Sequence, residues 1–364
     1  MSKARIKQIR SRIDSIDDQM LSLLNERASL SKEIANVKTA MPEADLNAVY
    51  HPDRESLVLA RLRRMNEGPL TDGQVEQLFS EIKSCCLSLQ QSLTVAYLGP
   101  RGTYTEAAAI KQFGHFSATK SQASIDDVFR EVDAQHCHYG VVPVENSTEG
   151  VVNRTLDCLI EFNLRICAEV ELPIHHAFLA RRDTDPKSIK RIYSHQQSLA
   201  QCRRWLDANY RDVEQVAVSS NAEAARLVYD ESNTAAIAGI MAAEQYHLSV
   251  LQRNIEDRTG NSTRFLVIGT HEVGPTGNDK TSVLVRGSDE PGALFQILAP
   301  FQEFDVNLCR IETRPASKSK WSYVFMMDLE GHESTEPIRK ALNRIREIAL
   351  DVRSLGSYPK ASSA

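Results

Sequence analysis

The chain has 364 residues, 42% of them hydrophobic and 25% charged, which is the composition of a globular protein with room for about two or three domains. A net charge of −5 without a dense Lys/Arg tract gives no support to nucleic-acid or membrane binding, so small molecules are the expected partners. No apolar run approaches the length of a membrane span, and the N-terminus lacks the apolar core of a signal peptide, so we expect a cytoplasmic location.

The N-terminal segment has the pattern of one long amphipathic helix. Apolar residues recur at steps of three and four from Ile6 to Val37, and Arg27 interrupts this stripe. A cation at that position needs an anionic partner if the stripe is buried. Lys38 lies on the same face as Arg27, roughly 16 Å further along the axis, whereas Arg10 lies elsewhere around the helix.

Two shorter helices follow this long one. They are predicted over residues 53–65 and 71–90, with a break at 68–71 between them. Thr71 has the side chain of an N-cap and is expected to begin the second of the two. Residues 1–92 are therefore predicted to form an all-helical domain.

The pattern changes at Leu93, where strands and helices begin to alternate. A strand at 93–98, a tight loop and a helix at 105–113 form the first βα unit, whose loop could meet an anion. The alternation continues to Ile268 and predicts an α/β domain over residues 93–271, with two lobes and a cleft between them.

Two polar clusters lie at the ends of short apolar runs in this domain. Residues 145–150 (ENSTEG) follow the run 139–144, and residues 260–264 (GNSTR) precede the run 265–268. Each run is predicted to be a buried strand. Ligands bind at strand ends in open α/β sheets, and these hydroxyls, amides and one arginine suit a small polyoxygenated acid. The same residue types also populate ordinary capped turns, and that alternative stays open for either cluster alone.

The last segment follows a linker at residues 272–280, which is rich in Gly, Pro and Asn. Residues 281–358 are predicted to fold as strand, helix, strand, strand, helix and strand, which is the order of a ferredoxin-like α+β domain. Residues 359–364 are expected to form a frayed tail.

Short motifs mark all three segments. They are GPRGTY at 99–104, VPVENS at 142–147, SH at 194–195, TRF at 263–265, GAL at 292–294 and ETRP at 312–315. With the helical N-terminus, they resemble the bifunctional chorismate mutase/prephenate dehydratases of phenylalanine biosynthesis over essentially the whole chain. The resemblance implies an all-α mutase domain, a two-lobed α/β dehydratase domain like a periplasmic binding protein, and an α+β ACT domain.

The same resemblance implies two reactions and one regulator. Chorismate would rearrange to prephenate, and prephenate would then lose CO2 and water to give phenylpyruvate. Phenylalanine would act as the allosteric inhibitor. Because helical mutases and ACT modules associate with themselves, a homodimer or a dimer of dimers is implied.

Residues of the mutase site follow from the resemblance. The implied catalytic residues are Arg27, Lys38 and Gln90, and the implied substrate-binding residues are Arg10 of a partner subunit, Arg54 and Glu55. His51 and Cys86 stand where some family members have an aspartate and a serine. These departures leave open a dehydratase whose decayed mutase domain serves only for dimerisation.

The dehydratase and ACT sites are implied in the same way. Thr263 would be catalytic, by donating to the leaving hydroxyl or by orienting it. The implied substrate-binding residues are Asn146, Ser147, Ser194, His195, Gln201 and Arg264. The implied phenylalanine-binding residues are Gly292, Ala293, Leu294, Glu312, Thr313 and Arg314. A structural role remains equally open for His195, and Glu145 is expected to cap or pair rather than to catalyse.

No cofactor and no metal site are predicted. Residues 136–138 and 175–176 lack the spacing of a complete ligand set, and the seven cysteines form no CxxC pair, which indicates reduced thiols. The main rival class is a non-catalytic amino-acid sensor or transcriptional regulator. The acidic chain and the lack of a basic recognition helix disfavour that class.

Overall fold

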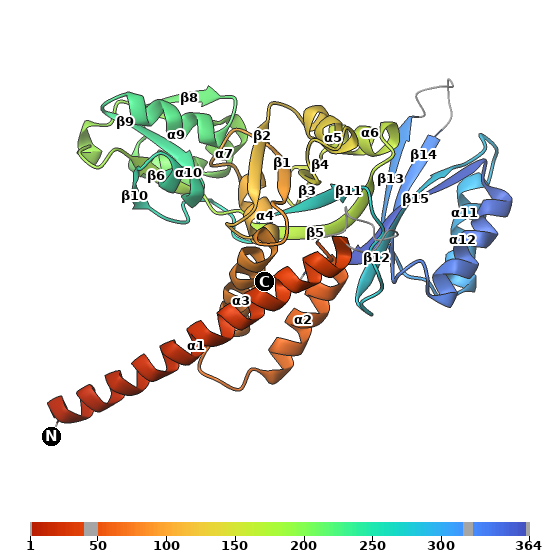
Figure 1. The fold of residues 1–364 in the computed structure, drawn as a ribbon. Coiled ribbons are helices and arrows are strands. Elements are labelled where there is room, and N and C mark those ends of the chain that lie inside the picture. The colour runs from red at the N-terminus through yellow and green to blue at the C-terminus, as the bar shows by residue number, and fades with distance from the viewer. Residues whose placement is uncertain (1, 40–49, 316–322, 362–364) are drawn as a thin grey trace.

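The computed structural model describes residues 2–39, 50–315 and 323–361, which fold into three regions (Figure 1). A helical N-terminal region, an α/β region of two lobes and a C-terminal α+β domain follow one another along the chain. This is the multidomain architecture that the sequence predicts. None of the helices in the described residues is both long and apolar enough to cross a membrane.

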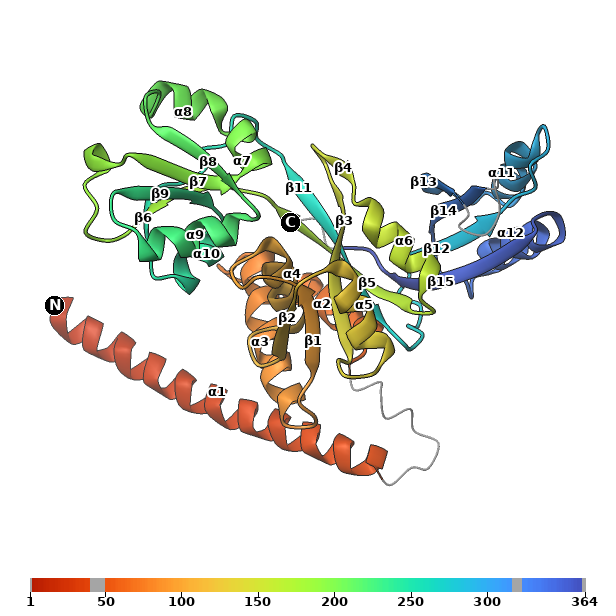
Figure 2. The ribbon, with the colours of Figure 1, turned by 90° about the horizontal axis from the view of Figure 1, so that it is seen from above.

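The N-terminal region contains α1 (Ser2–Thr39), α2 (Pro52–Met65) and α3 (Asp72–Ser88). Helices α2 and α3 pack on each other and against the rest of the chain, whereas much of α1 extends away from it, as Figure 1 and Figure 2 show. Thr71 begins α3 through a reciprocal capping box with Gln74, which confirms the predicted N-cap.

The apolar stripe of α1 is open to solvent in one chain. Along it, Ile13 is 50% exposed, Met20 52% and Leu23 64%, values unlike those of a helix packed in a closed bundle. The three helices are therefore all present as predicted, but they do not bury the stripe among themselves. A contiguous apolar face of this length is typical of an interaction surface.

Lobe 1 is built on a sheet with the strand order β2-β1-β3-β11-β5, and β4 pairs with the C-terminal end of β3. The pairs β1–β2 and β1–β3 are parallel, and β11 lies antiparallel between β3 and β5. The elements are β1 (Thr94–Leu98), α4 (Tyr104–Phe113), β2 (Ala118–Gln122), α5 (Ile125–Asp133), β3 (Tyr139–Asn146), β4 (Gly150–Val151), α6 (Asn153–Glu161), β5 (Arg165–Pro173) and β11 (Ser262–Gly269).

Lobe 2 is a second sheet with the order β10-β6-β9-β7-β8. The chain enters it after β5 and returns to lobe 1 through β11, so two segments connect the lobes. The elements are β6 (Ala177–Ala180), a 3-10 turn (Pro186–Ser188), β7 (Arg191–His195), α7 (Gln196–Gln201), α8 (Arg203–Asn209), β8 (Glu214–Val218), α9 (Asn221–Asp230), β9 (Thr234–Ala238), α10 (Ile240–Gln245) and β10 (Ser249–Gln252).

The C-terminal domain is an antiparallel sheet with the order β13-β14-β12-β15 and two helices packed on it. The predicted βαββαβ order is confirmed. The elements are β12 (Asp279–Arg286), α11 (Ala293–Glu303), β13 (Leu308–Pro315), β14 (Tyr323–Glu330), α12 (Glu336–Ile348) and β15 (Asp351–Pro359).

The expected frayed tail is wrong for residues 359–361. Strand β15 includes Pro359, Lys360 pairs with Glu330 at 2.7 Å, and the backbone N–H of Ala361 donates to Glu169 Oε1 at 2.9 Å. The apolar core is also continuous here, because Leu284 and Leu355 pack in the same cluster as Leu266 and Leu156 of lobe 1. Lobe 1 and the C-terminal domain thus share buried surface.

Candidate active sites

The first candidate site lies where α1 passes the end of α3. Gln90 Nε2 donates to Ser31 Oγ at 2.6 Å, which places Gln90 one helical turn from Arg27 along α1. Arg27 Nη1 is buried and has no hydrogen-bond partner among the described residues. A buried guanidinium nitrogen without an acceptor is costly, so this position suits an anionic ligand. The structure places Gln90 beside the turn of α1 that follows Arg27, and the proposed mutase roles of both residues stay a prediction.

Glu55 belongs to the same helical region and is held from two sides. Lys83 on α3 forms an ion pair with Glu55, and the two side chains are only 11% and 15% exposed. Burial raises the pKa of the Tyr50 hydroxyl, and the neighbouring Glu55 raises it further. The Tyr50 ring packs on Phe113 and Tyr139 of lobe 1, with ring centroids 4.9 and 5.4 Å apart.

Sequence reasoning missed Lys83 as part of this region. The available signal was its position seven residues before Gln90, which places both on one face of α3 and its extension. The Lys83–Glu55 ion pair joins α3 to α2, Gln90 follows the end of α3, and Tyr50 packs on lobe 1.

The other predicted mutase residues are not gathered around Arg27 within one chain. Arg10 is exposed on α1, about 25 Å from Arg27 along the helix axis. Arg54 is exposed on α2, and Lys38 lies in the last turn of α1, where its side chain is outside the described residues. Cys86 is buried, at 4% exposure.

The second candidate site lies where the two lobes meet. Asn146 ends β3, Thr263 lies opposite it on β11, and Gln201 ends α7. Asn146 Nδ2 donates to Thr263 Oγ1 at 2.8 Å and to Asn261 Oδ1 at 2.9 Å. Asn261 Nδ2 donates to Gln201 Oε1 at 3.4 Å, which carries the hydrogen bonds into lobe 2. We call these four residues and His176 the interlobe cluster.

The direction of the hydrogen bond between Asn146 and Thr263 is fixed by the backbone. Asn146 Oδ1 accepts the N–H groups of Thr148 and Glu149 at 2.9 and 3.0 Å, so Nδ2 must face Thr263. Thr263 Oγ1 is therefore the acceptor in its bond with Asn146. Its own hydroxyl hydrogen has no acceptor among the described residues and is free to donate to a ligand.

His176 holds the lobe 2 end of the cluster. It is 2% exposed, and its Nε2 lies 2.8 Å from Gln201 Oε1. Burial lowers the pKa of His176, which favours the neutral imidazole, and Nε2 must carry the hydrogen because an amide oxygen only accepts. Sequence reasoning considered residues 175–176 only as metal ligands and so missed this role.

Ser194 is wrong as a substrate contact. It is fully buried in β7, with its hydroxyl 2.8 Å from Ile237 O and 3.0 Å from Asn221 Oδ1. Asn221 Oδ1 also accepts the backbone N–H of His195, so Ser194 helps to fix the start of α7. His195 is partly buried there, and its role stays a prediction. Ser147 lies beside the cluster, with Oγ 3.3 Å from Asn261 Oδ1.

Arg264 is also wrong as a substrate cation. Successive residues of a strand face opposite sides, so Arg264 points away from the side that Thr263 faces. Its guanidinium bonds Glu169 at 2.7 Å, Asp328 at 2.8 Å and Tyr358 Oη at 3.1 Å. Burial opposes its charge, yet Tyr358 and the two carboxylates raise the pKa of Arg264. It therefore joins lobe 1 to the C-terminal domain.

The predicted phenylalanine-binding residues lie at one end of α11 and on β13. Gly292 precedes α11 with a φ of 86°, a left-handed conformation that favours glycine. Strand β13 lies at the edge of its sheet, and within the described residues no further strand pairs with its outer side. In this chain Arg314 bonds Asp157 at 2.6 Å and Asn153 at 2.9 Å, both on α6 of lobe 1.

Arg310 on the same strand lies between the two regions. Its side chain is 11% exposed, and its Nε lies 3.4 Å from Glu145 and 3.5 Å from Glu312. None of its three guanidinium nitrogens makes a regular hydrogen bond to a described residue. The expectation that Glu145 pairs is confirmed, because its partner is this arginine.

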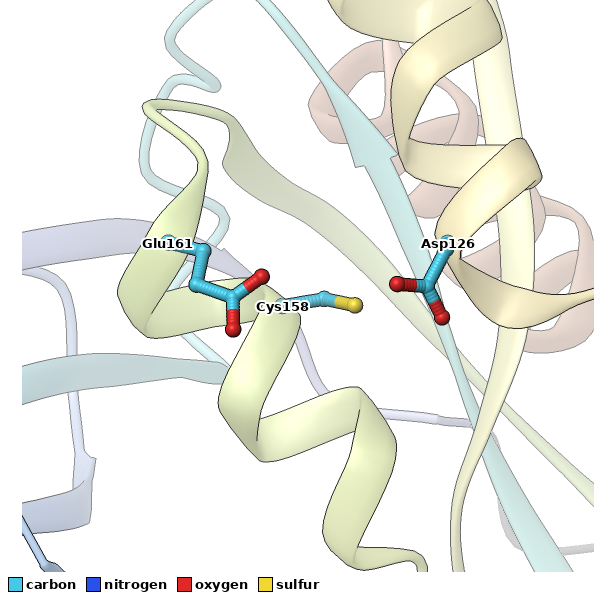
Figure 3. Close-up of side chains that lie close together, drawn as sticks. All are labelled: Asp126, Cys158 and Glu161. Atoms are coloured by element: carbon cyan, nitrogen blue, oxygen red, sulfur yellow. The ribbon is translucent and has the colours of Figure 1, made fainter. Parts of the chain in front are cut away.

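One cluster has the composition of a metal site. Asp126, Cys158 and Glu161 place their side-chain ligand atoms within 4.8 Å of one another (Figure 3). Arg154 already bonds both carboxylates and thereby joins α5 to α6. Burial raises the pKa of the Cys158 thiol to about 11, which keeps it protonated near neutral pH. The Arg154 ion pairs account for this cluster.

Comparison with known proteins gives three family matches along the chain. Residues 9–91 match chorismate mutase type II, residues 95–273 match prephenate dehydratase, and residues 281–347 match the ACT domain. A solved prephenate dehydratase from Arthrobacter aurescens, in complex with L-Phe, is 36% identical with a TM-score of 0.69. That match covers 74% of this chain and 90% of the other.

Two full-length relatives extend the match to the whole chain. The bifunctional chorismate mutase/prephenate dehydratase of Stutzerimonas stutzeri is 54% identical over 99% of this chain and 100% of its own. The protein of the same name from Pseudomonas aeruginosa is 52% identical over 98% of each chain. The chain belongs to the family of bifunctional chorismate mutase/prephenate dehydratases.

Proposed function

We propose that this chain converts chorismate to prephenate and prephenate to phenylpyruvate, and that phenylalanine inhibits the second reaction. The relatives named for both activities match almost its whole length. The observation that carries the dehydratase assignment is the hydroxyl hydrogen of Thr263 in the interlobe cluster, which has no acceptor in the described part of the chain. For the mutase it is the buried nitrogen of Arg27, which has no hydrogen-bond partner in residues 2–39, 50–315 and 323–361.

The mutase reaction is a pericyclic rearrangement, which needs no nucleophile and no proton transfer. Fixed cations and donors that hold the compact conformer and stabilise its transition state are sufficient. Arg27 and Gln90 supply such groups, and Lys38, Arg54 and Glu55 complete the proposed set. Arg10 is too far along α1 to reach its own Arg27, so it would come from a second copy.

That second copy would also cover the apolar stripe of α1. A homodimer, or a dimer of dimers, therefore fits both the exposed stripe and the distant Arg10. The open edge of β13 offers a further surface for self-association. Phenylalanine would bind near Gly292–Leu294 and Glu312–Arg314 between neighbouring C-terminal domains, as proposed from the family.

In the dehydratase reaction the bond to the departing carboxylate breaks, its electron pair enters the ring, and the ring hydroxyl leaves as hydroxide, which takes a proton from solvent to become water. Thr263 would donate a hydrogen bond to that hydroxyl. A threonine hydroxyl is a weak acid, so orientation and hydrogen bonding would matter more than complete proton transfer. Asn146 sets the direction of the donation because it occupies the acceptor side of Thr263. The ring becomes aromatic, which drives the reaction forward without a cofactor.

The test feeds purified protein chorismate or prephenate and follows phenylpyruvate with and without phenylalanine. Arg27→Ala should abolish most phenylpyruvate formation from chorismate and spare phenylpyruvate formation from prephenate. Thr263→Val should abolish phenylpyruvate formation from either substrate, while prephenate still forms from chorismate. Each loss should be about 10²- to 10³-fold, the usual effect of removing one positioned donor. Product from prephenate alone in the wild type would contradict the mutase assignment. No product from either substrate would favour an amino-acid sensor.

A further inference from the structure

Glu149 reaches across the two lobes beside the interlobe cluster. It follows Asn146 in the turn between β3 and β4 of lobe 1, and its side chain contacts α7 of lobe 2. Glu149 Oε2 accepts from Gln197 Nε2 at 3.1 Å, and Oε1 accepts from Gln201 Nε2 at 3.2 Å. Two amide donors from adjacent turns of one helix therefore hold a single carboxylate.

The donor from Gln201 is directed toward this position by other residues. Gln201 Oε1 faces the opposite way, because it accepts from His176 Nε2 at 2.8 Å and from Asn261 Nδ2 at 3.4 Å. Its Nε2 must then project toward Glu149 whether or not a carboxylate is there. The position of the Gln201 Nε2 donor is therefore set by the fold, independently of the acceptor that it binds.

The Glu149 carboxylate, which accepts from these two donors, is held only weakly. Its side chain is exposed, and both of its hydrogen bonds are at the long end of the normal range. The turn that carries it is fixed by its backbone, since the N–H groups of Thr148 and Glu149 donate to Asn146 Oδ1. The Glu149 side chain can therefore leave without releasing Asn146 and Thr263.

We propose that Gln197 and Gln201 form the seat for one of the two carboxylates of the dehydratase substrate, and that Glu149 occupies this seat until the substrate displaces it. This inference rests on the proposed dehydratase function. Gln197 is then a substrate-binding residue, and Glu149 is an internal competitor of the same chemical class as the group it mimics. The competition lowers the apparent affinity for substrate by the fraction of molecules in which the seat is free.

The test compares the steady-state KM and kcat for prephenate in wild-type protein, Glu149→Gln and Glu149→Ala. KM should fall about three- to tenfold in Glu149→Ala and less in Glu149→Gln, whose amide oxygen can still accept. The kcat should stay within about twofold, because no bond to Thr263 changes. Glu214→Gln removes the same charge from an exposed carboxylate at the start of β8, the opposite end of lobe 2, and should leave KM unchanged.

The role of Gln197 is tested in both backgrounds. Gln197→Ala should raise KM about tenfold with little change in kcat. In the double variant with Glu149→Ala, the gain from removing Glu149 should shrink, because the two residues act at one seat and their effects are not additive. If Glu149→Ala lowers KM by the same factor with and without Gln197, the two residues do not act at one seat.

Two further results would overturn the inference. If Glu149 instead holds the lobes together productively, KM will rise or kcat will fall in Glu149→Ala. An unchanged KM in both Glu149 variants would show that the carboxylate does not compete with substrate. Inactivity of wild-type protein on prephenate would be a different failure, because it would contradict the proposed function before the seat is tested.

Discussion

The two candidate sites differ in how much of each is present in a single chain. The interlobe cluster is continuous from Thr263 to His176, with the direction of every hydrogen bond set by backbone groups or by burial. In the helical site, Arg27 Nη1 is buried without a hydrogen-bond partner among the described residues, beside a long exposed apolar stripe. The interlobe cluster is thus linked by hydrogen bonds within one chain, whereas the described part of the helical region leaves a cation without an acceptor and an apolar surface uncovered.

This difference has a physical origin in the supporting structure. Asn146 and Thr263 lie on neighbouring strands of the buried sheet of lobe 1, so their side chains have few alternatives. Arg27 lies on α1, and much of that helix extends away from its own chain. We therefore expect perturbations of the shared core to damage the dehydratase, and perturbations of the stripe to damage the mutase.

The largest effect is expected when the buried link behind the interlobe cluster is broken. Arg264→Met leaves Asp328 buried without its cation and leaves Glu169 paired with Lys280 alone, which should lower the free energy of unfolding by about 3 to 5 kcal/mol. Denaturant unfolding followed by near-UV circular dichroism measures the change. Dehydratase activity should be lost at lower denaturant concentrations than in the wild type. Without denaturant, where the variant is still folded, it should bind prephenate.

Arg226→Met is the matched control, because Arg226 is paired with Glu223 and Asp230 on the exposed surface of α9. Exposed pairs contribute little, so its unfolding curve should overlay that of the wild type. Equal destabilisation by the two variants would mean that Arg264 acts as an ordinary surface residue. It would also remove the contrast between a core-supported site and an exposed one.

The next largest effect is expected from charging the stripe of α1. Ile13→Asp with Ile16→Asp should separate the copies, lower mutase activity by about 10²-fold or more, and leave dehydratase activity within about twofold. Light scattering gives the mass and the two assays give the activities. Ser11→Asp with Ser15→Asp adds the same charges on the opposite face of the helix and should change neither. Mutase activity that survives in a monomer would show that one chain completes the site.

Local patterns predicted the elements of this fold well, because the periods of helices and strands are written in the sequence itself. The long helix, the capping box at Thr71 and the βαββαβ order of the C-terminal domain all follow from such patterns. The strand-end positions of Asn146 and Thr263 were predicted in the same way. What the pattern did not contain was the partner of each side chain.

Arg264 shows where sequence reasoning failed. Its neighbour Thr263 faces the interlobe cluster, but the next side chain along a strand points to the opposite face of the sheet. Asp328 and Tyr358 pack on that face and bind Arg264, which the sequence pattern did not show. Ser194 was misjudged and Lys83 was missed for the same reason, since their partners are distant in sequence. Roles that depend on tertiary contacts need the fold.

The smallest expected effect concerns the link from the C-terminal domain to the interlobe cluster. Arg310 lies beside Glu312, one of the predicted phenylalanine-binding residues, and beside Glu145, whose neighbour Asn146 orients Thr263. Because one guanidinium faces both carboxylates, a change at Glu312 should alter the position of β3. Arg310→Gln removes that charge and should raise the phenylalanine concentration for half-inhibition about fivefold, the low end of typical coupling.

The uninhibited kcat should change by less than about twofold in Arg310→Gln, because Arg310 touches no residue proposed to bind substrate. Inhibition curves at several phenylalanine concentrations measure the effect, and Arg286→Gln, at an exposed arginine on strand β12 of the same sheet, is the control. If Arg310→Gln loses activity and keeps its phenylalanine sensitivity, Arg310 supports the catalytic strand and carries no signal. If phenylalanine sensitivity falls while dehydratase activity is kept, Arg310 transmits the effect of phenylalanine from the C-terminal domain to the interlobe cluster.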